Sequence, residues 1–118
     1  SGGGDTRYRI RVNIGVAYGS DLDRVLLVLE QIALANPAIC RKPEPRVRFR
    51  EFGASKLDFE LLAWIEEPSL RGLLVHELNC AIYQRFKEEQ IVIPFPQQDI
   101  WVRQLPGNDN PADNAAQS

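Results

Sequence analysis

Methionine is absent from the sequence, which holds one histidine and two cysteines among its 118 residues. Cys40 and Cys80 lie too far apart for a Cys-x-x-Cys metal or redox motif, and two thiols with one imidazole form a poor zinc ligand set. So few cysteines also exclude a disulfide-stapled scaffold. We expect a cytosolic chain with reduced thiols, held together by its apolar core.

Long apolar runs are absent as well. The run Val25 to Leu29 has five residues, far fewer than the ~18 that a membrane span requires. The N-terminus lacks the basic and apolar segments of a signal peptide. We expect a domain taken from a longer protein, with residues 1–6 as a linker or a cloning remnant.

Neither sign of charge dominates, because 14 Lys and Arg residues oppose 16 Asp and Glu residues, which gives a net charge of -2. The chain therefore has no overall attraction for nucleic acid or anionic lipid. With 44% hydrophobic and 25% charged residues, its composition is that of an ordinary globular protein. A chain of this length is expected to form one domain with one core, which we place at residues 7–104.

Alternating apolar residues predict three strands. The first covers residues 8–18, the second begins at Arg46, and the third covers 57–65 and pairs with the second as a hairpin. The hairpin turn contains Gly53, where we expect a positive φ. A short last strand is predicted at 99–103, after two prolines that a central strand would not tolerate.

Two helices are predicted from apolar positions that recur every three or four residues. Gly19 gives the chain a tight exit from the first strand, and Ser20 caps a helix that runs to about Asn36. The inward stripe of this helix comprises Leu22, Val25, Leu26, Leu29, Ile32 and Ala33. A second helix opens at Glu66 and runs to Glu89, with an apolar stripe of Leu70, Leu74, Leu78, Ile82 and Phe86.

Leu27 and Leu34 lie outside the inward stripe, on the opposite side of the first helix. They are seven residues apart and share one face with Arg24 and Gln31. They form either a second contact surface or isolated surface leucines, and the periodicity alone does not choose between these interpretations.

The order strand, helix, strand, strand, helix, strand predicts an α+β fold, the ferredoxin-like split βαβ (βαββαβ) two-layer sandwich. In this topology the first strand lies beside the third, and the third lies beside the second. The outward residues then form cross-strand rows in which arginines of the first two strands face carboxylates of the third. The tail, residues 105–118, has little to bury and is expected to be disordered.

No motif of an enzyme stands out. The sequence contains no Ser-His-Asp order, no Walker loop and no dinucleotide-binding fingerprint. His76 and Cys80 are four residues apart on one helix face, but two ligands do not make a metal site. We therefore expect no enzyme activity, no cofactor and no metal.

RNA binding is a second interpretation, because the same split βαβ fold carries RNA-recognition modules. Cations and stacking rings suited to this role are Arg9, Arg11, Arg48, Arg50, Trp64 and Trp101. Carboxylates interrupt that surface, and the third strand lacks the basic and aromatic motif of such a module. A free-standing ferredoxin-like module that binds RNA or a small ligand is therefore the alternative function.

Three segments match one family in order and spacing. They are Val16 to Asp23 (VAYGSDLD), Glu51 to Phe59 (EFGASKLDF) and Ile93 to Asp99 (IPFPQQD). With these segments, the sequence resembles the C-terminal cytoplasmic α/β domain of the mechanosensitive channel of small conductance, over about Arg11 to Arg103. Any one segment would be weak, but three in order are specific.

The resemblance implies a subunit of a bacterial inner-membrane channel, a homoheptamer that opens under membrane tension and releases solutes during hypo-osmotic shock. The domain would lie on the cytoplasmic side, assemble with other subunits of the same channel and surround a vestibule. After the two prolines, Gln97 to Arg103 would join a small barrel contributed by all subunits. No nucleic-acid partner is implied.

The same resemblance makes a subunit interface the candidate functional site, because a neighbouring chain or domain would cover exposed apolar residues. Gln90 stands where the family often has a helix-ending glycine, so Gln90→Gly is expected to raise stability. Leu62 stands where the family often has a polar residue. The candidate interface residues are Leu27, Leu34, Leu62, Trp64, Pro94, Pro96, Ile100, Trp101 and Val102, and Gly19, Ser20 and Gly53 have turn or cap roles.

Overall fold

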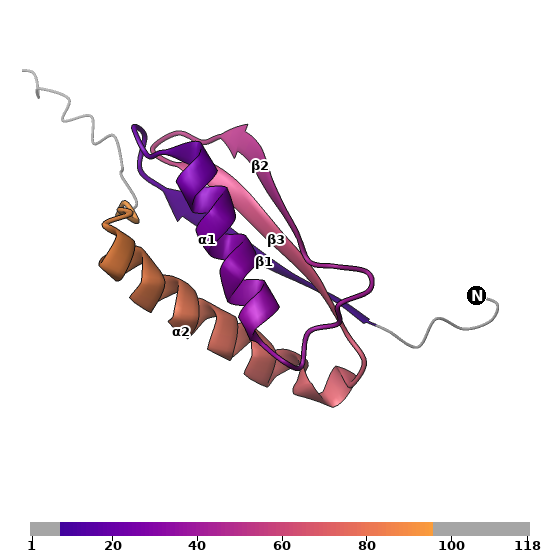
Figure 1. Ribbon diagram of the computed structural model, residues 1–118. Coiled ribbons are helices and arrows are strands. Elements are labelled where there is room, and N and C mark those ends of the chain that lie inside the picture. Colours follow the sequence, from indigo (N-terminus) through magenta and orange to yellow (C-terminus); the bar gives the residue numbers. More distant parts are fainter. Residues whose placement is uncertain (1–7, 96–118) are drawn as a thin grey trace, which may run out of the picture.

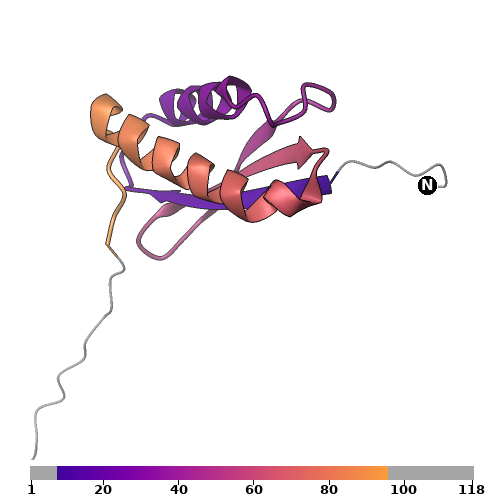
Figure 2. The ribbon, with the colours of Figure 1, turned by 90° about the horizontal axis from the view of Figure 1, so that it is seen from below.

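The computed structural model describes residues 8–95. Its sheet has three antiparallel strands: β1 (Tyr8–Val16), β2 (Arg46–Phe52) and β3 (Leu57–Ile65). Two helices, α1 (Leu22–Ala35) and α2 (Arg71–Glu89), lie on the same side of this sheet (Figure 1, Figure 2). A short 3-10 helix, η1 (Pro68–Leu70), precedes α2. The domain is therefore a two-layer α/β sandwich, as predicted.

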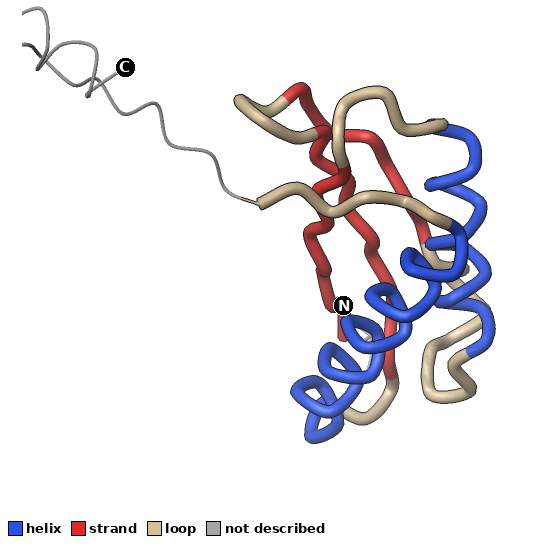
Figure 3. The backbone as a smooth tube through the Cα atoms, turned by 90° about the vertical axis from the view of Figure 1, so that its left-hand side faces the viewer, coloured by secondary structure: helices blue, strands red, loops and turns tan. Residues whose placement is uncertain are grey.

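The strand order is β1-β3-β2, with β3 in the centre. Figure 3 shows the three strands in one layer and the two helices in the other. β1 pairs with β3 along its whole length, from Tyr8 opposite Ile65 to Val16 opposite Leu57. The register between β2 and β3 shifts between Phe49 and Glu51, which marks a β-bulge. The predicted order of the first five elements and the predicted neighbours of the third strand are confirmed.

Residues 1–7 and 96–118 lie outside the described part of the chain. Predictions that fall on them stay predictions: the linker, the last strand, the tail, and the interface roles of Pro96, Ile100, Trp101 and Val102.

The core lies between the sheet and the two helices, because each layer presents one apolar face to the other. β3 contributes its inward residues Leu57, Phe59, Leu61, Ala63 and Ile65, and α2 contributes Leu74, Leu78, Ile82 and Phe86. Leu70 was expected on the α2 stripe but lies in η1 and is exposed. The turn before α2 is a 3-10 helix, so Leu70 does not share the direction of the later residues.

α1 is capped by Asp21 rather than by the predicted Ser20. The Asp21 carboxylate accepts a hydrogen bond from the Arg24 N–H at 3.2 Å, while the Ser20 hydroxyl donates to the Ala17 carbonyl at 2.7 Å. Both residue types can cap a helix, so the turn geometry decides which one does. Gly19 has a φ of 95°, and this tight exit ends β1 at Val16, two residues before the predicted end.

The buried stripe of α1 differs from the prediction at two positions. Leu22, the first residue of the helix, is exposed, whereas Val28 is buried. Val28 lies three residues after Val25 and four before Ile32, so it belongs to the same face. The packed stripe is therefore shifted toward the middle of the helix.

Gln90 caps the C-terminus of α2, and its φ of 60° and ψ of 33° are left-handed. The Ile91 N–H donates to the Phe86 carbonyl at 2.8 Å, and the Gln90 N–H reaches the Lys87 carbonyl at 3.3 Å. These two bonds form a Schellman motif, in which glycine is preferred at the left-handed position. The predicted left-handed cap is confirmed.

Replacing Gln90 by glycine is therefore expected to raise the free energy of unfolding by about 0.5 to 1 kcal/mol, because glycine adopts a positive φ without strain. Urea denaturation measures this change. Gln84→Gly, in the interior of α2, is the matched control and should lower stability by about 1 kcal/mol. If Gln90→Gly lowers the free energy of unfolding, the positive φ of Gln90 does not strain the helix end.

Candidate subunit interface

Leu27 and Leu34 lie on the side of α1 away from the core, and both are exposed, Leu27 to 53%. Leu27 borders a groove of about 400 Å³ between α1 and the segment that leads into β2, where Pro43 and Arg48 also line it. A leucine exposed beside a groove has surface available for a partner chain. Their interface role stays a prediction.

The open face of the sheet carries the expected rows of charge. Leu62 of β3 lies between these rows and is only 9% exposed, and Trp64 is half-buried. The guanidinium carbon of Arg46 lies 5.9 Å from the Trp64 ring centroid, a cation–π contact. Leu62 therefore presents little surface to a partner. The exposed arginines of this face are Arg9, Arg11, Arg46, Arg48 and Arg50.

Glu60 is the buried carboxylate of the open face, with 9% of its surface exposed. One carboxylate oxygen lies 2.9 Å from Arg11 Nε of β1, and the other lies 3.9 Å from Arg50 Nε of β2. A single side chain of the central strand therefore links both outer strands by ion pairs.

Glu60→Gln is expected to lower the free energy of unfolding by about 1 kcal/mol, because the amide keeps the shape but loses the attraction to two guanidinium groups. The effect stays modest because both arginines are largely exposed. Glu30→Gln, at an exposed position of α1, is the matched control and should change stability by less than about 0.5 kcal/mol. Equal urea midpoints for the two variants would show that the Glu60 pairs add no net stability.

The segment that follows α2 is apolar and exposed. Ile91 packs into the core, but Val92, Ile93 and Phe95 are exposed, Phe95 to 86%. Pro94, a predicted interface residue, lines a cavity of about 320 Å³ together with Ile93, Phe95 and residues of α2. Tyr83 on α2 adds a further exposed ring to this cavity. Exposed apolar surface of this kind is typical of contact sites, and the interface role of Pro94 stays a prediction.

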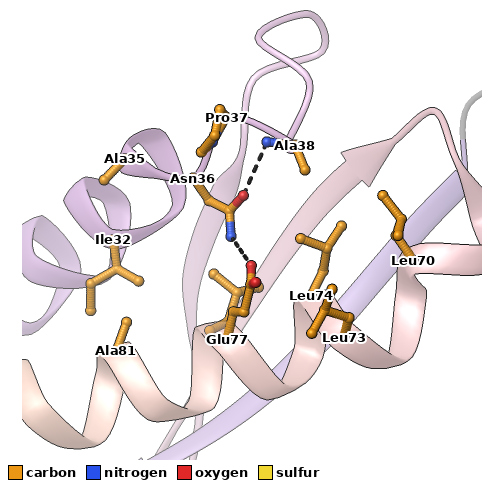
Figure 4. Close-up of a pocket in the computed structure, with 11 residues that line it drawn as sticks. Ile32, Ala35, Asn36, Pro37, Ala38, Leu70, Leu73, Leu74, Glu77 and Ala81 are labelled. Atoms are coloured by element: carbon orange, nitrogen blue, oxygen red, sulfur yellow. Dashed lines mark hydrogen bonds between the residues drawn. The ribbon is translucent and has the colours of Figure 1, made fainter.

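A second apolar groove, of about 500 Å³, lies between the end of α1 and the start of α2 (Figure 4). Leu70 and Leu73 are exposed at its rim. The Asn36 amide nitrogen donates to the Glu77 carboxylate at 3.1 Å, and the Asn36 side-chain oxygen accepts from the Ala38 N–H at 3.0 Å. Asn36 therefore joins the exit of α1 to α2 at this end of the groove.

Several exposed apolar residues were not identified from the sequence. Leu73 lies off the four-residue stripe of α2, so periodicity did not select it. The segment after α2 did carry a signal in the sequence. Four of residues 91–95 are apolar or aromatic, and they directly follow the end of the predicted helix. The residues missed at this end of the domain are Tyr83, Val92, Ile93 and Phe95.

Gly53 lies in the hairpin turn, but its expected positive φ is wrong, since Gly19 is the glycine with a positive φ among residues 8–95. Crowding explains the glycine instead. A Cβ at position 53 would lie 2.8 Å from the Lys56 carbonyl oxygen and 2.9 Å from Asp58 Oδ2. The Tyr18 hydroxyl donates to the Gly53 carbonyl at 2.5 Å, which joins the turn after β1 to the hairpin.

His76 and Cys80 are exposed neighbours on α2, with the sulfur 3.7 Å from Nε2 of the imidazole. Across residues 8–95, no group of three or more His, Cys, Asp or Glu side chains is placed to hold a metal ion. Neither helix in that range combines the length and the apolar character that crossing a bilayer would demand.

Comparison with known proteins identifies relatives of this domain. The mechanosensitive channel MscK of Escherichia coli (strain K12) is 40% identical over 105 residues, which cover 89% of this chain and 9% of MscK. An uncharacterized MscS family protein of Haemophilus influenzae is 40% identical over 99 residues, covering 84% of this chain and 9% of that protein. The crystal structure of Helicobacter pylori MscS in the closed state has a TM-score of 0.73 at 25% identity, covering 84% of this chain and 39% of that chain.

This chain therefore spans less than two fifths of each of these three relatives. The family model for the C-terminal part of the mechanosensitive ion channel MscS matches residues 10–93, which include almost all of β1 and every later described element. The resemblance drawn from the three sequence segments is confirmed. The chain belongs to the family of C-terminal domains of the mechanosensitive ion channel MscS.

Proposed function

We propose that this chain is the cytoplasmic C-terminal domain of a subunit of a bacterial inner-membrane channel. In that channel, membrane tension opens a pore and solutes leave the cell during hypo-osmotic shock. The observation that carries the proposal is the family match over residues 10–93, together with 40% identity to a mechanosensitive channel over 89% of the chain.

Within such a channel, the domain serves assembly. Copies of the chain join as a homoheptamer around a cytoplasmic vestibule, and residues 97–103 pair with neighbouring copies. The exposed apolar segment that ends at Phe95 supports this role, because it leads directly into those residues. The groove beside Leu70 and Leu73 offers a second apolar contact at the opposite end.

The RNA-binding alternative is less well supported by the charges of the open sheet face. Glu60 lies at its centre and pairs with Arg11 and Arg50, so the protein itself neutralises part of the arginine row. A phosphate backbone would have to compete with this carboxylate for the same guanidinium groups.

A chimera tests the proposed function directly. The matching C-terminal segment of Escherichia coli MscK is replaced by this chain, and membrane patches from cells without other mechanosensitive channels are recorded under suction. We expect tension-dependent currents and survival of hypo-osmotic shock. The control chimera carries Phe59→Ala, which disrupts the core. A folded chimera that reaches the membrane but neither assembles nor conducts would refute the proposal.

A further inference from the structure

Within residues 8–95, the outer edge of β1 has no strand paired with it. β1 is the first strand in the order β1-β3-β2, so only one of its sides faces β3. At one end, the Arg71 guanidinium donates to the Arg9 carbonyl at 3.2 Å. At the other end, the Ala17 N–H donates to the Val92 carbonyl at 2.9 Å. Odd-numbered residues of this strand therefore turn their main-chain groups toward the free edge.

The pairing of β3 supports this assignment. Trp64 lies opposite Arg9, and its carbonyl accepts from the Cys40 N–H at 2.7 Å, on the side away from β1. Arg9 and Trp64 are therefore a pair without mutual hydrogen bonds, as alternate pairs in an antiparallel ladder are. The same alternation leaves the N–H and C=O groups of Arg11, Asn13 and Gly15 facing the open edge.

The chain after α2 meets β1 at the end of the edge where a fourth, antiparallel strand would start to pair. Val92 is hydrogen-bonded to Ala17, so an antiparallel continuation would place every second residue opposite an edge-facing residue of β1. Residue 94 would lie opposite Gly15, residue 96 opposite Asn13 and residue 98 opposite Arg11. Residues 94 and 96 are both proline.

Each of these pairs requires an N–H from the fourth strand, and proline has none. Pro94 cannot donate to the Gly15 carbonyl, and Pro96 cannot donate to the Asn13 carbonyl. Residues 91–95 accordingly form no strand, and Phe95 is exposed rather than packed on the edge. At the far end, the Arg9 carbonyl already accepts from Arg71.

We propose that Pro94 and Pro96 exclude the chain's own continuation from the β1 edge, so that residues 97–103 remain available to pair with another copy. The first part rests on the register described above, and only the second part rests on the proposed function. The charged side chains of Arg9 and Arg11 on the same strand discourage unrelated strands from pairing with the edge.

Amide hydrogen exchange of the 118-residue chain, followed by NMR, tests the exclusion. In the natural sequence we expect fast exchange at Asn13 and Gly15 and slow exchange at their neighbours Val12 and Ile14, which pair with β3. The variant Pro94→Val with Pro96→Val regains both donors. Exchange at Asn13 and Gly15 should then slow at least tenfold, with Val12 and Ile14 unchanged.

The matched control is Phe95→Val with Gln97→Val, which places two valines in the same segment but adds no donor at the edge-facing positions. It should leave exchange at Asn13 and Gly15 fast. Slow exchange at both residues in the natural sequence would overturn the inference, as would unchanged fast exchange in the Pro94→Val, Pro96→Val variant.

Sedimentation of the same variants separates this inference from the proposed function. If Pro94→Val with Pro96→Val slows exchange at Asn13 and Gly15 and also lowers self-association, the proline exclusion and the pairing with another copy both hold. If it protects the edge while neither chain self-associates even at high concentration, the proline exclusion holds and the pairing of residues 97–103 with another copy fails. If the chain self-associates but exchange at Asn13 and Gly15 stays fast in the Pro94→Val, Pro96→Val variant, the proline exclusion fails and the assembly proposal stands.

Discussion

Alanine in place of Phe59 is expected to lower the free energy of unfolding by about 3 to 5 kcal/mol. Phe59 lies in the central strand, is 1% exposed and stacks on Phe49 with ring centroids 5.1 Å apart. Ile14 of β1 lies opposite on the other side. Because strands border this ring on two sides and helices cover it, the close-packed core cannot collapse to fill the space.

This loss approaches the whole stability of an ordinary domain, which is about 5 to 15 kcal/mol. Urea denaturation should show a sharply lower midpoint, and part of the Phe59→Ala protein should be unfolded without denaturant. Phe95→Ala is the matched control, since Phe95 is 86% exposed and its replacement should change stability by less than about 0.5 kcal/mol. Similar midpoints for the two variants would contradict the described core.

Valine in place of Gly53 is expected to lower the free energy of unfolding by about 2 to 3 kcal/mol. The Gly53 N–H donates to the Lys56 carbonyl at 2.7 Å and closes the hairpin turn, and a Cβ would come within 2.8 Å of that same oxygen. The obstacle is backbone, so it cannot rotate away as a flexible side chain would. The closing hydrogen bond of the β2–β3 hairpin would therefore be strained or lost.

Alanine at position 53 distinguishes crowding from backbone conformation, because its Cβ meets the same oxygen. Gly53→Ala should therefore cause most of the loss seen with valine. Gly19→Ala is the comparison: no atom lies within 4 Å of its Cβ, and its φ of 95° is the sole penalty, about 1 kcal/mol. If Gly19→Ala lowers the melting temperature more than Gly53→Ala does, the crowding at Gly53 is refuted.

Local patterns were sufficient for most of the described architecture. The alternation around Phe59 and the four-residue repeat around Phe86 predicted the central strand and α2, and both residues are in the core. The position of Gln90 in the family pattern predicted a left-handed helix end, and its φ confirms it. These features depend on residues close together in sequence, which periodicity and family spacing report directly.

The candidate interface stays a prediction, and the structure shows only how exposed its described residues are. Leu27 is exposed and Pro94 lines a cavity, whereas Leu62 is 9% exposed. The burial of a side chain on the central strand depends on what the two outer strands place beside it. The neighbours of Leu62 come from segments about 15 and 50 residues away in the chain, so no local pattern reports them.

The order of strands and helices, the apolar face of each and the family itself follow from the sequence alone, because periodicity and motif spacing are properties of neighbouring residues. The structure decided which of Ser20 and Asp21 caps α1, that Gly53 is required by crowding, and that Val92 is hydrogen-bonded to Ala17 at the end of β1. The first two depend on the backbone geometry of short turns, which the residue types alone do not fix. The third joins segments far apart in the chain, which meet only when the sheet and the helices pack together.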